Sequence, residues 1–183
     1  MSGRDRQRNI SRGYKSSGVL TEEELLSLPG VPSKKRAAEG PVAVVECAEK
    51  FPCNPCETAC VHGAIKIGKP IINLPELDVE ACLGCGECIP QCPGLAIFVM
   101  DFTYSDSEAS ISFPYEFLNL PNVGDEVKAV NRAGEVVTTG KVIKVENHPS
   151  QDRTSVITIS VPKRFGWEVR GIQRKACKRD ERR

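Results

Sequence analysis

Eight of the nine cysteines in this 183-residue chain lie between residues 47 and 92, and their spacing constrains the fold more than any other feature. The stretch "CLGCGECIPQCP" has the regular spacing C-x2-C-x2-C-x3-C and is followed by Pro93. Such a loop wraps three thiolates around one metal centre and places the fourth on the following turn. Gly84 and Gly86 permit tight turns in this loop, because they have no Cβ. We therefore expect the chain to fold around metal here.

An earlier stretch, "CAEKFPCNPCETAC", repeats this pattern imperfectly. When the two stretches are aligned, the position that corresponds to Cys82 is occupied by Lys50. The first cysteine of the earlier stretch, Cys47, lies three residues further upstream. Each half reads as a strand, a cysteine loop, a short helix and a strand, which predicts a pseudo-twofold module. At an offset of 32 residues, Cys53, Cys56, Cys60 and Ala64–Ile65 correspond to Cys85, Cys88, Cys92 and Ala96–Ile97.

The surroundings of the cysteines favour metal over disulfides. The sequence has no apolar run long enough to span a membrane and no apolar segment behind its basic N-terminus, so we expect a cytoplasmic protein. Clustered cysteines in an intracellular protein indicate metal binding. Eight thiolates could also hold two zinc ions, but zinc ribbons present two separated C-x2-C pairs. The tight run with a further cysteine three residues on favours iron–sulfur clusters.

The rest of the chain divides by composition. Within the N-terminal arm, the polar segment 1–18 reads as flexible, "TEEELLSL" predicts a short helix with a Thr21–Glu24 capping box, and "GVPSKKRAAEGP" reads as a linker. Two apolar runs around Gly68–Lys69 predict a hairpin. Alternating runs such as "EVVTTGKVIKVE" and "TSVITISV" predict a small all-β barrel or meander. The expected divisions are an arm with a short helix at 1–40, the cysteine module at 41–103, the β domain at 110–172 and a basic tail at 173–183.

The complete second motif resembles that of the bacterial-type ferredoxins, which hold two [4Fe–4S] clusters. The resemblance covers residues 42–101, about a third of the chain. It implies an α+β fold, here a ferredoxin-like two-cluster domain with an N-terminal arm and a small C-terminal all-β domain. In this family the last cysteine of each motif reaches the other cluster. The implied ligands are Cys60, Cys82, Cys85 and Cys88 for one cluster, and Cys53, Cys56 and Cys92 with a fourth residue for the other.

Cys47 is the candidate for that fourth ligand. It follows the β-branched run "VAVV" directly, and the residues "AEKFP" could bulge outward while its side chain points inward. The alternative is that Cys47 is a buried bystander and that this cluster is incomplete, for example [3Fe–4S]. The sequence leaves both open.

A weaker resemblance rests on "VECAEKFPCNPCETAC", on "VPKRFGWEVRGI" and on the order of a ferredoxin module followed by a β domain. These features look like the ferredoxin-type subunits of multi-subunit, flavin-dependent dehydrogenases of anaerobes. Such complexes oxidise amino acids such as proline, or opine-like secondary amines. The resemblance implies a non-catalytic subunit that passes electrons between a flavoprotein dehydrogenase partner and another acceptor.

Two other functions stay open. A nucleic-acid-binding protein with structural clusters would suit the basic ends, but the net charge of +1 and the few aromatic residues in the β runs disfavour it. A redox sensor would suit a labile cluster with one odd ligand. No nucleophile–base pair or nucleotide-binding loop appears, so we expect no catalytic residues. His62, two residues after Cys60, is a possible ligand, but a solvent-facing residue or one that supports the ligands is favoured. We expect His148 to be exposed and Cys177 to be a thiol without a partner.

Overall fold

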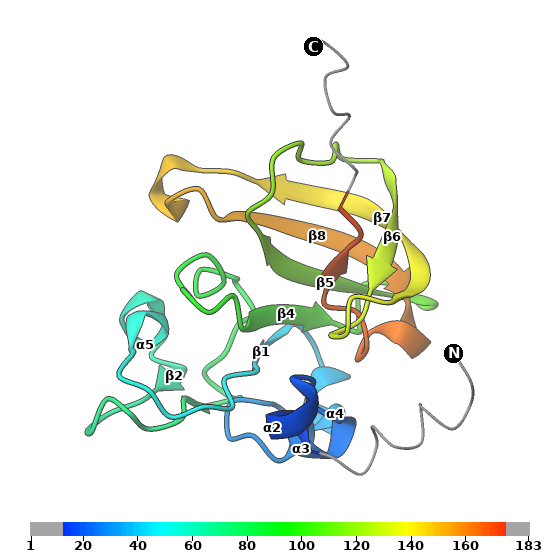
Figure 1. Ribbon diagram of the computed structural model, residues 1–183. Coiled ribbons are helices and arrows are strands. Elements are labelled where there is room, and N and C mark those ends of the chain that lie inside the picture. The colour runs from blue at the N-terminus through cyan, green and yellow to red at the C-terminus, as the bar shows by residue number, and fades with distance from the viewer. Residues whose placement is uncertain (1–12, 175–183) are drawn as a thin grey trace.

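The computed structural model describes residues 13–174 and consists mainly of antiparallel sheet (Figure 1). Seven strands form one sheet in the order β1-β4-β5-β8-β7-β6-β9, and β2 pairs with β3 in a second, small sheet. The strands are β1 (Val42–Val45), β2 (Ile65–Lys66), β3 (Glu76–Leu77), β4 (Ile97–Asp101), β5 (Glu108–Tyr115), β6 (Glu126–Val130), β7 (Val136–Glu146), β8 (Ser155–Pro162) and β9 (Gly171–Ile172). Two 3-10 turns, η1 (Pro149–Gln151) and η2 (Lys163–Phe165), flank β8.

Three short helices precede the sheet: α2 (Tyr14–Ser17), α3 (Glu22–Leu26) and α4 (Lys34–Ala37). The predicted capping box of α3 is present, because Thr21 accepts from the Glu24 amide and the Glu24 carboxylate accepts from the Thr21 amide. The other two helices lie where the sequence predicts a flexible arm and a linker. The Glu24 carboxylate also accepts from the Tyr14 amide at 3.0 Å, which fixes the start of α2. The Ser33 hydroxyl caps α4.

The internal repeat is visible in the backbone hydrogen bonds of the cysteine region. The Glu46 amide donates to Ala96 O, and the Asp78 amide donates to Ala64 O, each at 2.8 Å. These two bonds are related by the 32-residue offset, with the two halves exchanged. The pairing of β1 with β4 and of β2 with β3 follows the same relation. Strands of one half therefore pair with strands of the other half, and this pairing brings the two cysteine loops together.

The two halves differ in helix content. The first contains α5 (Pro55–Ala59), in which the Thr58 amide donates to Asn54 O at 3.3 Å. At the same place in the second half stands Pro90, which has no N–H to donate to Gly86 O. The short helix predicted in both halves therefore forms only in the first, among the described residues.

The predicted hairpin around Gly68–Lys69 is wrong in its second strand. β2 pairs with β3, which begins after the apolar run that the sequence placed in the hairpin. The carbonyl of Ile71, within that run, instead accepts from the Cys53 amide at 3.3 Å. The run thus anchors the first cysteine loop.

Strand β4 lies between β1 and the C-terminal strands (Figure 1). It is buried on both faces and joins two parts of the core. Ile97 and Val99 pack into the core around the cysteines. Phe98 and Met100 pack into the core formed by the C-terminal strands. Because β4 also pairs with β5, the sheet runs without interruption from the cysteine region into the C-terminal strands.

The C-terminal strands include three of the predicted runs, which form β6, β7 and β8. Strand β5 was not predicted, although its side chains alternate between buried and half-buried along its whole length. Within residues 13–174, no helix is long and apolar enough to cross a membrane.

Candidate metal centres

The structure gathers eight cysteines into two groups, each around its own cavity. Each group takes members from both halves of the repeat, because Cys92 joins the first group and Cys60 joins the second. The first group consists of Cys47, Cys53, Cys56 and Cys92, and the second of Cys60, Cys82, Cys85 and Cys88. The second group and three members of the first are the ligands that the resemblance to ferredoxins implies, and Cys47 is the candidate for the fourth ligand of the first group.

Cys47 lines the first cavity, whereas Lys50 has an exposed side chain. Burial raises the pKa of the Cys47 thiol, and the nearby thiols of Cys92 and Cys53 raise it further. The loop after Cys47 is held from outside the repeat, since the Tyr14 hydroxyl donates to Ala48 O at 3.3 Å. Although Cys47 lies three residues upstream of the position that the repeat predicts, its thiol is close to those of the other cysteines in the first group.

The first cavity has a volume of about 460 Å³. Apolar side chains form much of its wall, including Leu20, Phe51 and Ile67. Tyr14 on α2 also lines this cavity, so the N-terminal segment takes part in the site. An apolar wall limits the access of water and lowers the local dielectric around a bound group.

The second cavity is smaller, with a volume of about 20 Å³. Its loop turns at Gly84 and Gly86, which have φ values of +64° and +85° in the left-handed region. A Cβ on Gly84 would lie 2.6 Å from the Pro41 Cβ, so this position also requires glycine for close packing. The Arg36 guanidinium on α4 donates to Cys82 O at 3.1 Å and to Val79 O at 3.0 Å.

Three backbone amides point at cysteine sulfur atoms. The Ala64 amide lies 3.2 Å from Cys60 Sγ, and the Ala96 amide lies 3.4 Å from Cys92 Sγ, at equivalent places in the repeat. The Ala43 amide lies 3.4 Å from Cys82 Sγ. Such N–H donors stabilise the negative charge of thiolates that ligate a cluster. Each group has four sulfur atoms, with an amide directed at Cys92 in the first group and at Cys60 and Cys82 in the second. Such a donor set fits an iron–sulfur cluster.

The most buried thiols have strongly shifted pKa values. Burial raises the pKa of Cys56 to about 11, with the neighbouring thiol of Cys92 adding to the shift. Burial and the thiols of Cys82 and Cys85 raise the pKa of Cys88 to about 12. Ligands bind metal as thiolates, so cluster binding must displace a proton from each of these side chains.

The other residues weighed in the sequence lie apart from the two groups or at their edge. His62 is exposed at the rim of the second cavity, and His148 is exposed before η1. Cys177 lies outside the described residues. Over residues 13–174, no three His, Cys, Asp or Glu side chains are placed to hold a single metal ion.

Tyr14 and Arg36 contribute to the two sites, and sequence reasoning missed both. The helix that carries Arg36 had a detectable signal, because Ser33 followed by "KKRAA" is a typical N-cap before helix-forming residues, but its contacts with Val79 O and Cys82 O are long-range. Tyr14 had no such signal in the sequence, because its contact with Ala48 O depends on tertiary structure.

Comparison with known proteins identifies the second motif. Residues 75–98 match the family model of the 4Fe-4S binding domain. No curated protein shows a significant match to this chain, and neither does any solved structure. The matched residues include Cys82, Cys85, Cys88 and Cys92, so these four cysteines lie in a segment that is similar to 4Fe–4S binding domains.

Proposed function

We propose that this chain is an electron-transfer subunit with two [4Fe–4S] clusters in a pseudo-twofold, ferredoxin-like module. The first cluster is held by Cys47, Cys53, Cys56 and Cys92, and the second by Cys60, Cys82, Cys85 and Cys88. The observation that carries this proposal is the division of eight cysteines into two groups of four that exchange Cys60 and Cys92 between the halves. The match of residues 75–98 to a 4Fe–4S binding domain supports the iron–sulfur assignment.

A [4Fe–4S] cluster with four thiolate ligands accepts and donates one electron at a time with little rearrangement. The protein's contribution is to hold the sulfur atoms, to direct amides at them and to set their exposure to water. Two such sites within one small module suit a relay in which an electron enters at one site and leaves at the other.

Both sites reach the surface beside exposed apolar side chains. Phe51 beside the first site and Leu83 beside the second occupy equivalent positions in the repeat and are 44% and 61% exposed. Val61, which follows Cys60, is 77% exposed, and Cys85 is the exposed cysteine of the second group. Apolar side chains at the edge of a redox site favour contact with protein partners. We assign these partners as a flavoprotein dehydrogenase and an electron acceptor in the cytoplasm.

Anaerobic affinity purification from the native host tests this proposal. The proposal predicts that a flavoprotein is retained with the chain and that reduction of its flavin by substrate also bleaches the cluster absorbance. Loss of iron during repeated reduction and oxidation would instead favour a sensor. Binding to heterogeneous DNA or RNA at moderate salt, with no flavoprotein retained, would favour the nucleic-acid alternative.

A further inference from the structure

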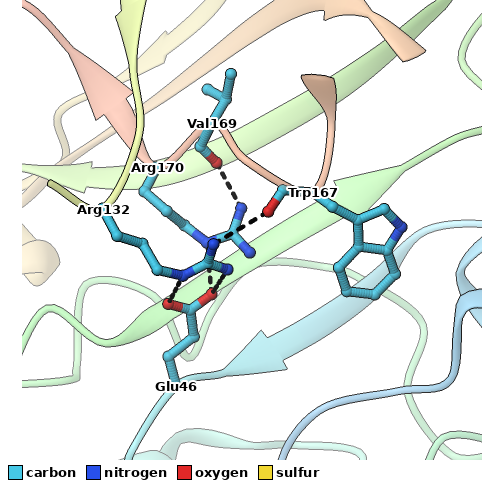
Figure 2. A network of polar contacts seen from close by, with 5 residues as sticks. All are labelled: Glu46, Arg132, Trp167, Val169 and Arg170. Carbon is cyan, nitrogen blue, oxygen red and sulfur yellow. Dashed lines mark hydrogen bonds and ion pairs between the residues drawn. The ribbon is translucent and has the colours of Figure 1, made fainter. Parts of the chain in front are cut away.

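A buried ionic network joins Glu46, which lines the first cavity, to two arginines of the C-terminal region (Figure 2). The Glu46 carboxylate accepts two hydrogen bonds from Arg132, from Nε at 2.8 Å and from Nη2 at 2.6 Å. It accepts a third from Arg170 Nε at 2.5 Å. The two arginines also donate to backbone carbonyls, Arg132 to Trp167 O and Arg170 to Val169 O. Glu46 is thereby fixed from two directions.

The network lies almost entirely out of water. The side chains of Glu46 and Arg170 are 8% and 5% exposed, and that of Arg132 is 16% exposed. The Arg170 guanidinium also lies 5.1 Å from the ring centroid of Phe98 on β4. Removing charges from water costs free energy that their mutual attraction often only balances, so such a network is weak evidence for a purely stabilising role. A role in holding one defined geometry is better supported.

The two arginines sit on firmly anchored backbone. Arg132 lies in the turn between β6 and β7, where Asn131 Oδ1 accepts from the amides of Ala133 and Glu135. Arg170 directly precedes β9, and its amide donates to Val130 O at 2.9 Å. Both guanidinium groups are therefore presented to Glu46 by the C-terminal strands.

The repeat supplies a reference for what Glu46 does. Asp78 occupies the equivalent position in the second half, and its Oδ1 accepts from the amides of Glu80 and Ala81 at 3.2 Å. Asp78 thus organises the turn that leads to Cys82 from within the cysteine module. Glu46 stands before the lengthened loop of the first half, where Cys47 is the next residue and the carboxylate is engaged by the C-terminal strands instead.

We propose that Glu46, held by Arg132 and Arg170, is the positioning residue for Cys47, so that the C-terminal strands complete the first cluster site. The acidic residue at this position of the repeat orders the approach to the first cysteine in both halves. In the second half it does so through neighbouring amides, and in the first half through two arginines from another part of the chain. This inference rests on the proposed function, because it requires a cluster bound by Cys47.

Anaerobically purified Glu46→Gln and Arg132→Met proteins test this inference. Glu46→Gln removes the charge that both arginines pair with, and Arg132→Met removes two of the three hydrogen bonds that hold the residue before Cys47. We expect the iron content to fall by about one atom per chain and a [3Fe–4S] signal to appear in the oxidised EPR spectrum, because the first cluster loses one ligand. Arg132→Lys keeps the charge but has a single nitrogen, so it cannot reproduce the pair of hydrogen bonds that Nε and Nη2 of Arg132 donate. We expect it to give a smaller [3Fe–4S] signal than Arg132→Met.

Two matched variants separate positioning from general destabilisation. Ile159→Ala removes a fully buried side chain from the same C-terminal core and takes away none of the hydrogen bonds of the network, and it should keep both [4Fe–4S] signals. Asp78→Ala should alter the second cluster and leave the first unchanged. An unchanged EPR spectrum in Glu46→Gln and Arg132→Met, or the same [3Fe–4S] signal in Ile159→Ala, would overturn the inference alone. A wild-type protein without two [4Fe–4S] clusters would overturn the proposed function, and the inference with it.

Discussion

At the scale of single residues, the first cysteine group depends on which side chain supplies its fourth sulfur atom. Lys50 occupies the repeat position of Cys82 but is exposed, while Cys47 lines the cavity. The sequence identified Cys47 as the candidate from its place after a strand. It could not identify Tyr14 or the two arginines as neighbours of this loop, because those contacts join residues far apart in the chain.

Replacing Cys47 by alanine removes one sulfur atom from the first group. We expect the first cluster to convert to [3Fe–4S], with loss of about one iron atom per chain. Iron analysis and EPR of the oxidised protein measure both changes. Lys50→Ala serves as the control and should keep the wild-type spectrum. If Cys47→Ala shows that spectrum as well, Cys47 is not a ligand.

Gly84→Ala tests the tight turn in the loop of the second site. Gly68→Ala, at a position with the same φ, serves as the comparison. Gly84 and Gly68 both have φ of +64°, but only Gly84 would place a Cβ against Pro41. We expect Gly68→Ala to cost about 1 kcal/mol of unfolding free energy, from the left-handed backbone alone. Gly84→Ala should cost about 3 kcal/mol, because overpacking adds to that strain. Denaturant titration of the cluster-bound proteins measures both, and equal costs would contradict the assigned contact.

At the scale of elements, the strand pattern was more predictable than the short helices. The runs "VAVV" and "IFVM" are continuously apolar, which is typical of strands buried on both faces, and they form β1 and much of β4. The helix expected in both halves forms only as α5, since Pro90 removes the required donor from the second half. Strand β5 was not predicted, although buried and half-buried residues alternate regularly along it, with Pro114 among them.

Substitutions at two neighbouring residues of β4 test whether its two faces have separate roles. Phe98→Ala should lower the free energy of unfolding by about 3–4 kcal/mol, because it empties a large site in the C-terminal core. Its effect on the second cluster should be small. Val99 lines the second cavity, so Val99→Ala should shift the reduction potential of that cluster while costing about 1–2 kcal/mol. Redox titration monitored by EPR measures the potentials, and a larger shift in Phe98→Ala than in Val99→Ala would contradict this division.

At the scale of the whole molecule, one sheet runs through both the cysteine region and the C-terminal strands. The sequence predicted two segments with a boundary between residues 103 and 110, because the character of the residues changes there. The pairing of β4 with β5 and the contact of Glu46 with Arg132 and Arg170 involve strand registers and long-range contacts. Composition and spacing along the chain carry no record of such contacts.

The continuous sheet predicts cooperative unfolding. We expect the cluster-bound protein to unfold in one thermal transition, because loss of β4 would remove the partner of β1 and one of the two partners of β5. Circular dichroism at a β-sheet wavelength and cluster absorbance should therefore change together on heating. Two well-separated transitions would show that the C-terminal strands are stable without the cysteine region.

The central claim is that this chain holds two [4Fe–4S] clusters in neighbouring sites. The most direct measurement is iron and zinc analysis of the anaerobically purified protein, combined with EPR of the dithionite-reduced sample. Our account predicts about eight iron atoms per chain and an EPR spectrum broadened by coupling between two reduced clusters. Colourless protein that contains zinc, or about four iron atoms per chain with an uncoupled spectrum, would contradict it.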